Sequence, residues 1–191
     1  MKKFLLKFLF AALSISISLF LCYFFIDDIF VRYATATQSF LCLRLFIAVL
    51  IYFSINWVMK NPIYTLERDI LFFSYLLLSI SVSLLRFRLS SSTPLNFNVI
   101  SIINYSKMTL FFNILFYIPF GFYFGKRIKL KTVYNFIIFL GYILIIEVLQ
   151  HYLRTGFFDI NDFILNGLGF LAGYASQKII MSFLTYRRLS T

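Results

Sequence analysis

Charged residues are scarce in this chain of 191 residues, since Asp, Glu, Lys and Arg together make up only 13% of it. A soluble domain has about 25% charged and roughly 45–50% apolar residues. Here 61% of the residues are apolar and 21% are aromatic, and the apolar ones come in long runs. This pattern excludes an ordinary soluble domain. It predicts an all-α membrane protein, a polytopic helical bundle of about six transmembrane helices with both termini cytoplasmic.

Acidic residues are the scarcest charged type, with 7 Asp and Glu against 18 Lys and Arg, and the formal net charge is +11. In a soluble protein this excess would suggest nucleic acid as a partner. Here the basic residues flank apolar runs, where they set membrane topology and contact anionic lipids. We therefore expect membrane lipids and no nucleic acid among the partners.

Cysteine and histidine are also rare. Cys22 and Cys42 both lie inside apolar runs, and His151 is the single imidazole. This excludes a disulfide framework and gives no metal-ligand spacing, so we assign no metal and no cofactor. At the N-terminus, Lys2 and Lys3 precede an apolar run that is too long for a cleaved signal peptide, which predicts an uncleaved first span.

Hydrophobic runs separated by polar stretches predict the number and position of the spans. We expect one membrane domain over residues 1–191, with three N-terminal spans in 1–93 and a core of three more in 94–178. The six predicted spans cover residues 4–26, 38–59, 69–85, 108–125, 132–152 and 163–186.

The distribution of basic residues predicts the orientation of these spans. With both termini inside, the cytoplasmic ends hold Lys2, Lys3, Lys7, Lys60, Arg68, Lys126, Arg127, Lys129, Lys131, Lys178, Arg187 and Arg188. The external loops then hold fewer, namely Arg32, Arg86, Arg88, Lys107 and Arg154. The loop 156–162 between the last two spans consequently faces outward.

Polar residues at membrane depth cost about 2.5–3.5 kcal/mol each, so their pattern is informative. Glu147, Gln150, His151 and Arg154 share one face of the fifth span. One face of the sixth span carries Asp162, Asn166, Gly169 and Gly173. The two polar faces meet at the turn Thr155-Gly156, at the same end of a helical hairpin.

Four short motifs follow one another in this part of the chain. They are Asn113-Ile-Leu-Phe-Tyr-Ile-Pro119-Phe-Gly121, then Glu147-Val-Leu-Gln150, then Arg154, Asp159 and Asp162, then Asn166-Gly-Leu-Gly169. In this order they resemble the VanZ-like family of bacterial integral membrane proteins, over roughly residues 94–178. The chain departs from the pattern in its loop, where Thr155-Gly156 follows Arg154. The resemblance implies a link to teicoplanin-type glycopeptide resistance and implies no known reaction.

Asn113, Glu147 and Asn166 are predicted to lie at a similar depth, because each is one to one and a half turns from the outer end of its span. With Gln150 they form a predicted polar cluster that is open to the outside, with Arg154, Asp159 and Asp162 at its mouth. One interpretation is a pocket for a polar head group. The other is a hydrogen-bonded plug that fixes the helix register.

Small residues predict close helix packing. Gly121 and Gly125 form one G-x-x-x-G motif and Gly169 and Gly173 form another, which lets helix backbones approach in lipid. Pro119 lies inside the fourth predicted span, where it removes a backbone donor and bends the helix.

The charged residues Arg44, Asp159, Asp162 and Glu147 leave more than one interpretation open. Arg44, in the second span, is expected to reach lipid phosphate or to pair with Glu147. Asp159 is expected to cap the start of the sixth span, as is Asn161. Alternatively, Asp159, Asp162 and Glu147 could bind a divalent cation or perform acid–base chemistry.

The preferred functional hypothesis is a non-enzymatic envelope protein of the bacterial cytoplasmic membrane. It would bind or shield a lipid-linked cell-wall precursor or a lipid-tailed glycopeptide antibiotic at the outer face. The alternatives are an integral-membrane hydrolase or transferase acting on a lipid pyrophosphate, and a small transporter or flippase component. The sequence shows no nucleophile beside an activating base, which disfavours the enzyme. The oligomeric state stays open.

Overall fold

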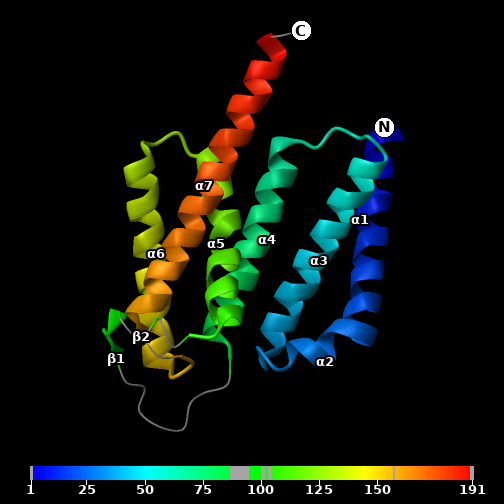
Figure 1. Cartoon of the computed structure of the whole chain (residues 1–191). Helices are drawn as coiled ribbons and strands as arrows, with labels where there is room; N and C mark the ends of the chain where they lie inside the picture. The colour runs from blue at the N-terminus through cyan, green and yellow to red at the C-terminus, as the bar shows by residue number, and fades with distance from the viewer. Residues whose placement is uncertain (1, 87–94, 100–101, 103–104, 157, 190–191) are drawn as a thin grey trace. The chain divides into compact units, whose positions relative to one another are not determined.

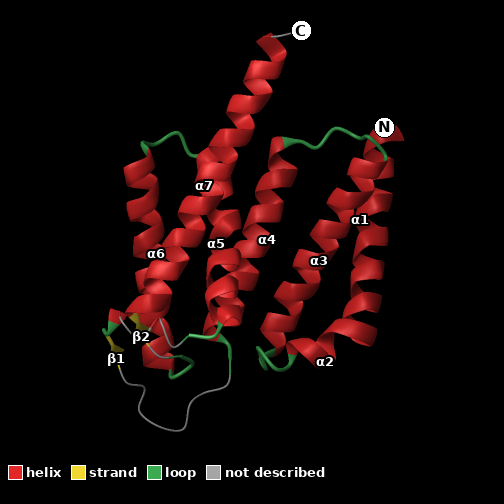
Figure 2. Cartoon of the chain, viewed as in Figure 1, coloured by secondary structure: helices red, strands yellow, loops and turns green. Residues whose placement is uncertain are grey.

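The computed structural model describes residues 2–86, 95–99, 102, 105–156 and 158–189 (Figure 1). The chain divides into two compact units, Met1–Arg88 (unit 1) and Leu89–Thr191 (unit 2). Both are built mainly of helices, and one pair of two-residue strands lies in unit 2 (Figure 2). The predicted all-α class is therefore confirmed.

The described residues of unit 1 form three long helices, and α3 packs against both α1 and α4. The first helix continues through a π-helical turn, η1, into the short helix α2 (Figure 1). The bounds are α1 Lys2–Leu21, η1 Cys22–Ile26, α2 Asp27–Phe30, α3 Thr37–Val58 and α4 Thr65–Leu84.

Buried serines lie where the helices of unit 1 meet. The Ser18 hydroxyl donates to the carbonyl oxygen of Arg44 at 2.7 Å, which joins α1 to α3. The Ser39 hydroxyl donates to the carbonyl oxygen of Ser81 at 3.4 Å, which joins α3 to α4. A serine side chain is small enough for two helices to approach and can hydrogen-bond across the interface, which favours it in lipid.

In unit 2, the part of the chain that the structure describes forms three long helices and the strand pair. Its bounds are β1 Leu95–Asn96, α5 Lys107–Arg127, α6 Thr132–Leu153, β2 Phe158–Asp159 and α7 Ile160–Leu189. The strands are parallel, with Leu95 opposite Phe158 and Asn96 opposite Asp159. This pairing ties the segment before α5 to the loop between α6 and α7.

Glycines bring α5 and α7 into backbone contact. A Cβ atom on Gly169 would lie 2.2 Å from the carbonyl oxygen of Ile114, and one on Gly173 would lie 2.0 Å from that of Ile118. On the facing helix, a Cβ on Gly121 would lie 1.8 Å from the carbonyl oxygen of Phe170. Gly125 has more room, since a Cβ there would lie 3.0 Å from its nearest neighbour, the side-chain atom Gln177 Oε1. Only glycine allows the first three approaches.

A layer of aromatic rings joins the three helices of unit 2. Phe139 of α6 stacks on Phe170 of α7 with ring centroids 4.4 Å apart. Tyr117 and Phe120 of α5 approach Phe139 at 5.6 and 5.8 Å. Each such pair contributes about 0.5–1.5 kcal/mol beyond the burial of its area. The layer therefore holds α5, α6 and α7 together at Phe139, about two to three turns of α6 before the polar residues Glu147 and Gln150. Pro119 lies within this part of α5, and the helix continues past it to Arg127.

The helices correspond to the six predicted spans, with boundaries that differ by a few residues. Among the described residues, four helical segments are long and apolar enough to cross a membrane: Leu5–Phe30, Thr37–Val58, Lys107–Arg127 and Thr132–Leu153. The helix α4 starts with a charged turn that holds Glu67, Arg68 and Asp69. The count of six spans and the cytoplasmic termini therefore stay predictions.

Candidate functional site

The polar residues of α6 are buried in unit 2. Glu147 is 4% exposed and Gln150 is 7% exposed. Both follow Phe139 and Ile143 along the buried side of α6. Burying a carboxyl group and an amide in a membrane helix is unfavourable unless they have polar partners. Their position therefore needs a structural or functional explanation.

The first turns of α7 place two further polar residues beside this end of α6. Asn166 is 4% exposed, while Asp162 is only partly buried. Asp162 Oδ1 accepts a hydrogen bond of 2.6 Å from Asn113 Nδ2 of α5. A hydrogen bond to a carboxylate is about twice as strong as one between neutral groups. Two of the predicted site residues, on helices far apart in sequence, are thus in direct contact.

Two buried atoms near this end of the hairpin have unused hydrogen-bonding capacity. Asn166 Oδ1 and Thr155 Oγ1 are both buried, and neither has a hydrogen-bond partner among the described residues. A buried polar atom without a partner costs about 1–3 kcal/mol. An incoming hydroxyl or N–H group would remove this penalty.

Asp159 is held by a network of hydrogen bonds in the loop before α7. Its Oδ2 accepts from the Tyr105 hydroxyl and, at 2.8 Å, from Asn96 Nδ2. Its Oδ1 accepts from the backbone N–H and the side-chain amide of Asn161, at 2.8 and 2.9 Å. Asn161 Nδ2 also donates to the carbonyl oxygen of Asn98 at 3.0 Å. Asp159 thus caps α7 and ties the α6–α7 loop to the segment before α5.

This network changes the titration of two side chains outside the membrane-spanning helices. Burial alone would raise the pKa of Asp159, but the hydrogen bonds from Tyr105, Asn161 and Asn96 stabilise its charged form and hold that pKa below its usual value. Burial raises the pKa of Tyr105, and its hydrogen bond to Asp159 and the nearby carboxylates raise it further. At neutral pH the pair is therefore a carboxylate and a neutral phenol.

The α6–α7 turn begins with Arg154, which has a left-handed backbone conformation with φ of 57°. The N–H of Arg154 bonds the carbonyl of His151 at 3.1 Å, and the N–H of Thr155 bonds that of Gln150 at 2.9 Å. This is the double hydrogen bond of a Schellman helix end. The side chain of Arg154 is exposed. The structure thus gives Arg154 a backbone role in the turn and shows no side-chain bond from it to the acids.

Arg44 belongs to unit 1 and has a partner that the sequence did not suggest. Its Nη2 donates to Asp27 Oδ2 at 2.5 Å. Asp27 starts α2, directly after the π-helical turn, which brings it next to the first half of α3. Lipid phosphate and Glu147 were the two expected partners of Arg44, and both stay predictions; the ion pair with Asp27 was not expected.

The sequence patterns did not predict the hydrogen-bond network that holds the α6–α7 loop. Its members besides Asp159 are Tyr105, Asn96, Asn98 and Asn161. Asn161 was considered only as a helix cap. The other three lie in a stretch of mixed polarity, and a two-residue parallel pairing leaves no periodic pattern. The available signal was the recurrence of Asn at 96 and 98 in a half-apolar stretch that ends at Tyr105.

Long apolar helices that bury polar residues at one end define a polytopic helical membrane protein. A model of the VanZ/LLP1 family matches residues 40–181, which cover α3 to α7, and the chain belongs to this family. No curated protein and no solved structure matches the chain.

Proposed function

We propose that this VanZ/LLP1-family membrane protein binds the polar head of a lipid-linked ligand at the outer face of the bacterial cytoplasmic membrane. By binding or shielding that ligand, it lowers susceptibility to lipid-tailed glycopeptide antibiotics. Two observations support the proposal: the bond between Asp162 and Asn113, and the burial of Glu147, Gln150 and Asn166 in the same unit. We call these five residues the hairpin site.

The burial of the hairpin site is graded. Asp162 and Asn113 are partly exposed, whereas Glu147, Gln150 and Asn166 are buried. Carboxylates accept hydrogen bonds only, and Asn166 Oδ1 is a buried acceptor without a partner among the described residues. The site therefore suits a head group rich in hydroxyl, amide or ammonium donors. A glycopeptide and a lipid-linked cell-wall precursor both carry such groups next to a lipid chain.

Asp159 has a separate role in this proposal. Four hydrogen bonds occupy its two oxygens, and one of them caps α7. It positions the first turn of α7, and through it Asp162, and does not contact the ligand. Arg154, at the turn, is exposed and free to meet a head group that enters from the membrane surface.

The outer-face assignment rests on the distribution of basic residues. More of them lie at the ends of the predicted spans opposite the α6–α7 loop, and basic residues favour the cytoplasmic side. Single-cysteine labelling tests it, after Cys22 and Cys42 are replaced by serine. A cysteine at Gly156 should react with an impermeant maleimide in intact cells, and one at Lys129 only after permeabilisation. The reverse pattern would place the hairpin site on the cytoplasmic side and exclude this proposal.

Susceptibility profiling tests the function itself. A strain with the gene should tolerate a lipid-tailed glycopeptide better than the strain without it, while a tail-less glycopeptide with the same peptide core should act on both equally. The tail matters because the site is at the end of membrane helices, where only a membrane-anchored ligand is concentrated. Equal protection against both drugs would contradict a lipid-linked ligand.

A further inference from the structure

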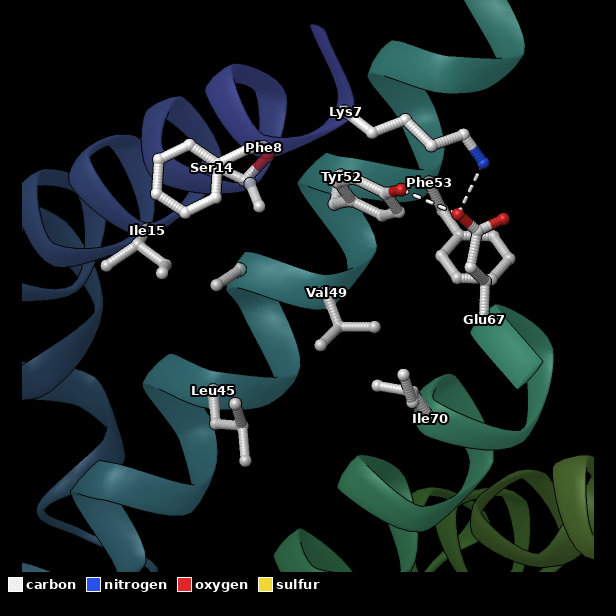
Figure 3. Close-up of a pocket in the computed structure, with 12 residues that line it drawn as sticks. Lys7, Phe8, Ser14, Ile15, Leu45, Val49, Tyr52, Phe53, Glu67 and Ile70 are labelled. Atoms are coloured by element: carbon white, nitrogen blue, oxygen red, sulfur yellow. Dashed lines mark hydrogen bonds and ion pairs between the residues drawn. The ribbon is translucent and has the colours of Figure 1, made fainter. Parts of the chain in front are cut away.

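Unit 1 contains a cavity of 430 Å³ between α1, α3 and α4 (Figure 3). Pockets for small ligands span about 300–1,000 Å³. We call this cavity the unit 1 groove. It belongs to a different part of the chain from the hairpin site.

One end of the unit 1 groove is polar. Glu67 Oε1 accepts from Lys7 Nζ at 2.5 Å and from the Tyr52 hydroxyl at 2.7 Å (Figure 3). Glu67 Oε2 accepts from the backbone N–H of Tyr64 at 2.7 Å, which fixes the carboxylate at the first turn of α4. Lys7 Nζ also donates to the carbonyl oxygen of Pro62 at 3.1 Å.

The rest of the groove is apolar. From Lys7 to Ile15 it follows about 12 Å of α1, at about 1.5 Å per residue. Its lining there includes Phe8, Leu45 and Val49. The hydroxyl of Ser14 donates to its own helix, to the carbonyl oxygen of Phe10 at 2.7 Å. The groove thus has one polar end and an apolar length, which is the shape of a single-chain amphiphile.

The position of the polar end corresponds to the membrane interface. Lys7 lies at the start of the membrane-spanning segment Leu5–Phe30, while Ile15 lies well inside it. A lysine at this depth keeps its ammonium at the level of lipid phosphates. The apolar part of the groove is then at the level of the acyl chains.

The charge of this end of unit 1 favours an anionic ligand. Lys60, in the α3–α4 connection, and Arg68, in the first turn of α4, are both exposed. Lys2 and Lys3 precede Lys7 on α1. An ammonium has three donor hydrogens, and the contacts of Lys7 with Glu67 and Pro62 use two. The ammonium also lies 4.1 Å from the centroid of the Tyr64 ring. Its third hydrogen can therefore face that ring or a phosphate oxygen.

We propose that the unit 1 groove is a specific site for one anionic phospholipid. An acyl chain fills the apolar length, and the phosphate lies against Lys7, with Lys60 and Arg68 supplying further positive charge. The lipid occupies the space between α1, α3 and α4 that side chains do not fill. The site is independent of the hairpin site and of its ligand.

Native mass spectrometry of the full chain in detergent tests this proposal, with phosphatidylglycerol and phosphatidylcholine of the same acyl chains as the two probes. The protein should retain one phosphatidylglycerol, and phosphatidylcholine at least fivefold less. Ala11→Phe fills the groove and should reduce retention of phosphatidylglycerol at least tenfold. Ala12→Phe is the matched control, because Ala12 is exposed and does not line the groove.

A second pair of substitutions tests the head group. Lys60→Gln with Arg68→Gln leaves the Lys7–Glu67 ion pair intact and should reduce the preference for phosphatidylglycerol to less than twofold. Equal retention of both lipids by the wild-type chain would overturn the proposal. So would full retention in Ala11→Phe, or no retained lipid at all, which would assign the groove to a protein segment.

Discussion

Most of the small residues buried in the described part of unit 1 are serines, whereas glycines bring the helices of unit 2 together. All seven glycines of the chain lie in residues 89–191. The buried serines of the described residues, Ser14, Ser18, Ser39, Ser74, Ser79, Ser81 and Ser83, all lie in unit 1. A hydroxymethyl group keeps two helix backbones apart and can bond across the gap, while a glycine lets the backbones touch.

This difference separates two kinds of site. Backbone contact at Gly121, Gly169 and Gly173 sets the register of α5 against α7, and in this register Asn113 bonds Asp162. Unit 1 packs less tightly and keeps a groove of 430 Å³. We propose that the hairpin site, in the closely packed unit, binds a polar head group, and that the groove in unit 1 binds a lipid chain.

The largest expected effect comes from breaking the tight packing of unit 2. Gly173→Leu places a side chain where a Cβ alone would be 2.0 Å from the carbonyl oxygen of Ile118. Overpacking costs about 1–3 kcal/mol where side chains can yield, and a backbone atom yields less. We expect little monodisperse protein by size-exclusion chromatography in detergent.

Gly141→Leu is the matched control for this substitution, since nothing lies within 4 Å of a Cβ at Gly141. It should leave the yield unchanged. Equal yields from Gly173→Leu and Gly141→Leu would mean that α5 and α7 do not touch, and the contrast between the units would fail.

A smaller effect is expected at the ion pair of unit 1. Arg44→Gln removes the partner of Asp27, whose other oxygen is already buried without a bond among the described residues. We expect a loss of about 1–2 kcal/mol in unfolding free energy, because the pair is partly exposed and hydrogen bonds to charged groups contribute about 1.5–3 kcal/mol. Thermal unfolding in detergent measures it.

The double variant Asp27→Asn with Arg44→Gln tests whether the loss comes from the pair. It should recover part of the stability, because no charge is then left without its partner. Additive losses in the double variant would show that Arg44 acts elsewhere, for instance on lipid phosphate.

The smallest expected effect concerns pH and the loop of unit 2. The pKa of Asp159 is lower in the folded chain than its usual value of 3.8. The charged side chain therefore stabilises the folded state above pH 3.8, and this stabilisation is lost as the pH falls through the folded pKa. The pKa of Tyr105 is raised above its usual 10.0, so its contribution is complete below 10.0 and lost as pH rises through the folded pKa.

The backbone amides of residues 158–162 should therefore be equally protected from hydrogen exchange between about pH 5 and 9, after correction for intrinsic rates. Protection should fall in stronger acid. In Asp159→Asn, these amides should lose most of their protection at neutral pH. Protection that rises on acidification would contradict the role of the carboxylate.

Much of the helical framework could be predicted from sequence, because long apolar runs define membrane helices by length alone. Helical periodicity placed Glu147 and Gln150 on one face of α6, and Asp162 and Asn166 on one face of α7. Asn113 was chosen from its motif and its depth, and a ligand site at these residues stays a prediction. The direct bond between Asn113 and Asp162 was not foreseen, because it depends on the register of α5 against α7. That register depends on which backbone atoms the glycines contact, and these contacts cannot be derived from the sequence.

Other features depend on local geometry that has no sequence pattern. The π-helical turn Cys22–Ile26 precedes Asp27, and the pairing of Asp27 with Arg44 follows from where the chain turns after it. The left-handed residue at the end of α6 is Arg154, although Gly156 is the residue whose type favours that conformation. The Lys7–Tyr52–Glu67 contacts join three helices, and no spacing rule links these positions.

The central claim is that negative charge in the hairpin site acts on a lipid-linked ligand. The most direct test is resistance to a lipid-tailed glycopeptide in strains that express Glu147→Gln or Asp162→Asn, with the membrane abundance of each variant quantified. An amide keeps the shape and much of the hydrogen bonding but removes the charge. Asp28→Asn is the control, because Asp28 is exposed and lies in unit 1. We predict that both hairpin variants lose resistance at wild-type abundance while Asp28→Asn keeps it. Full resistance from both would contradict the claim and leave the hairpin site as a plug that fixes helix register.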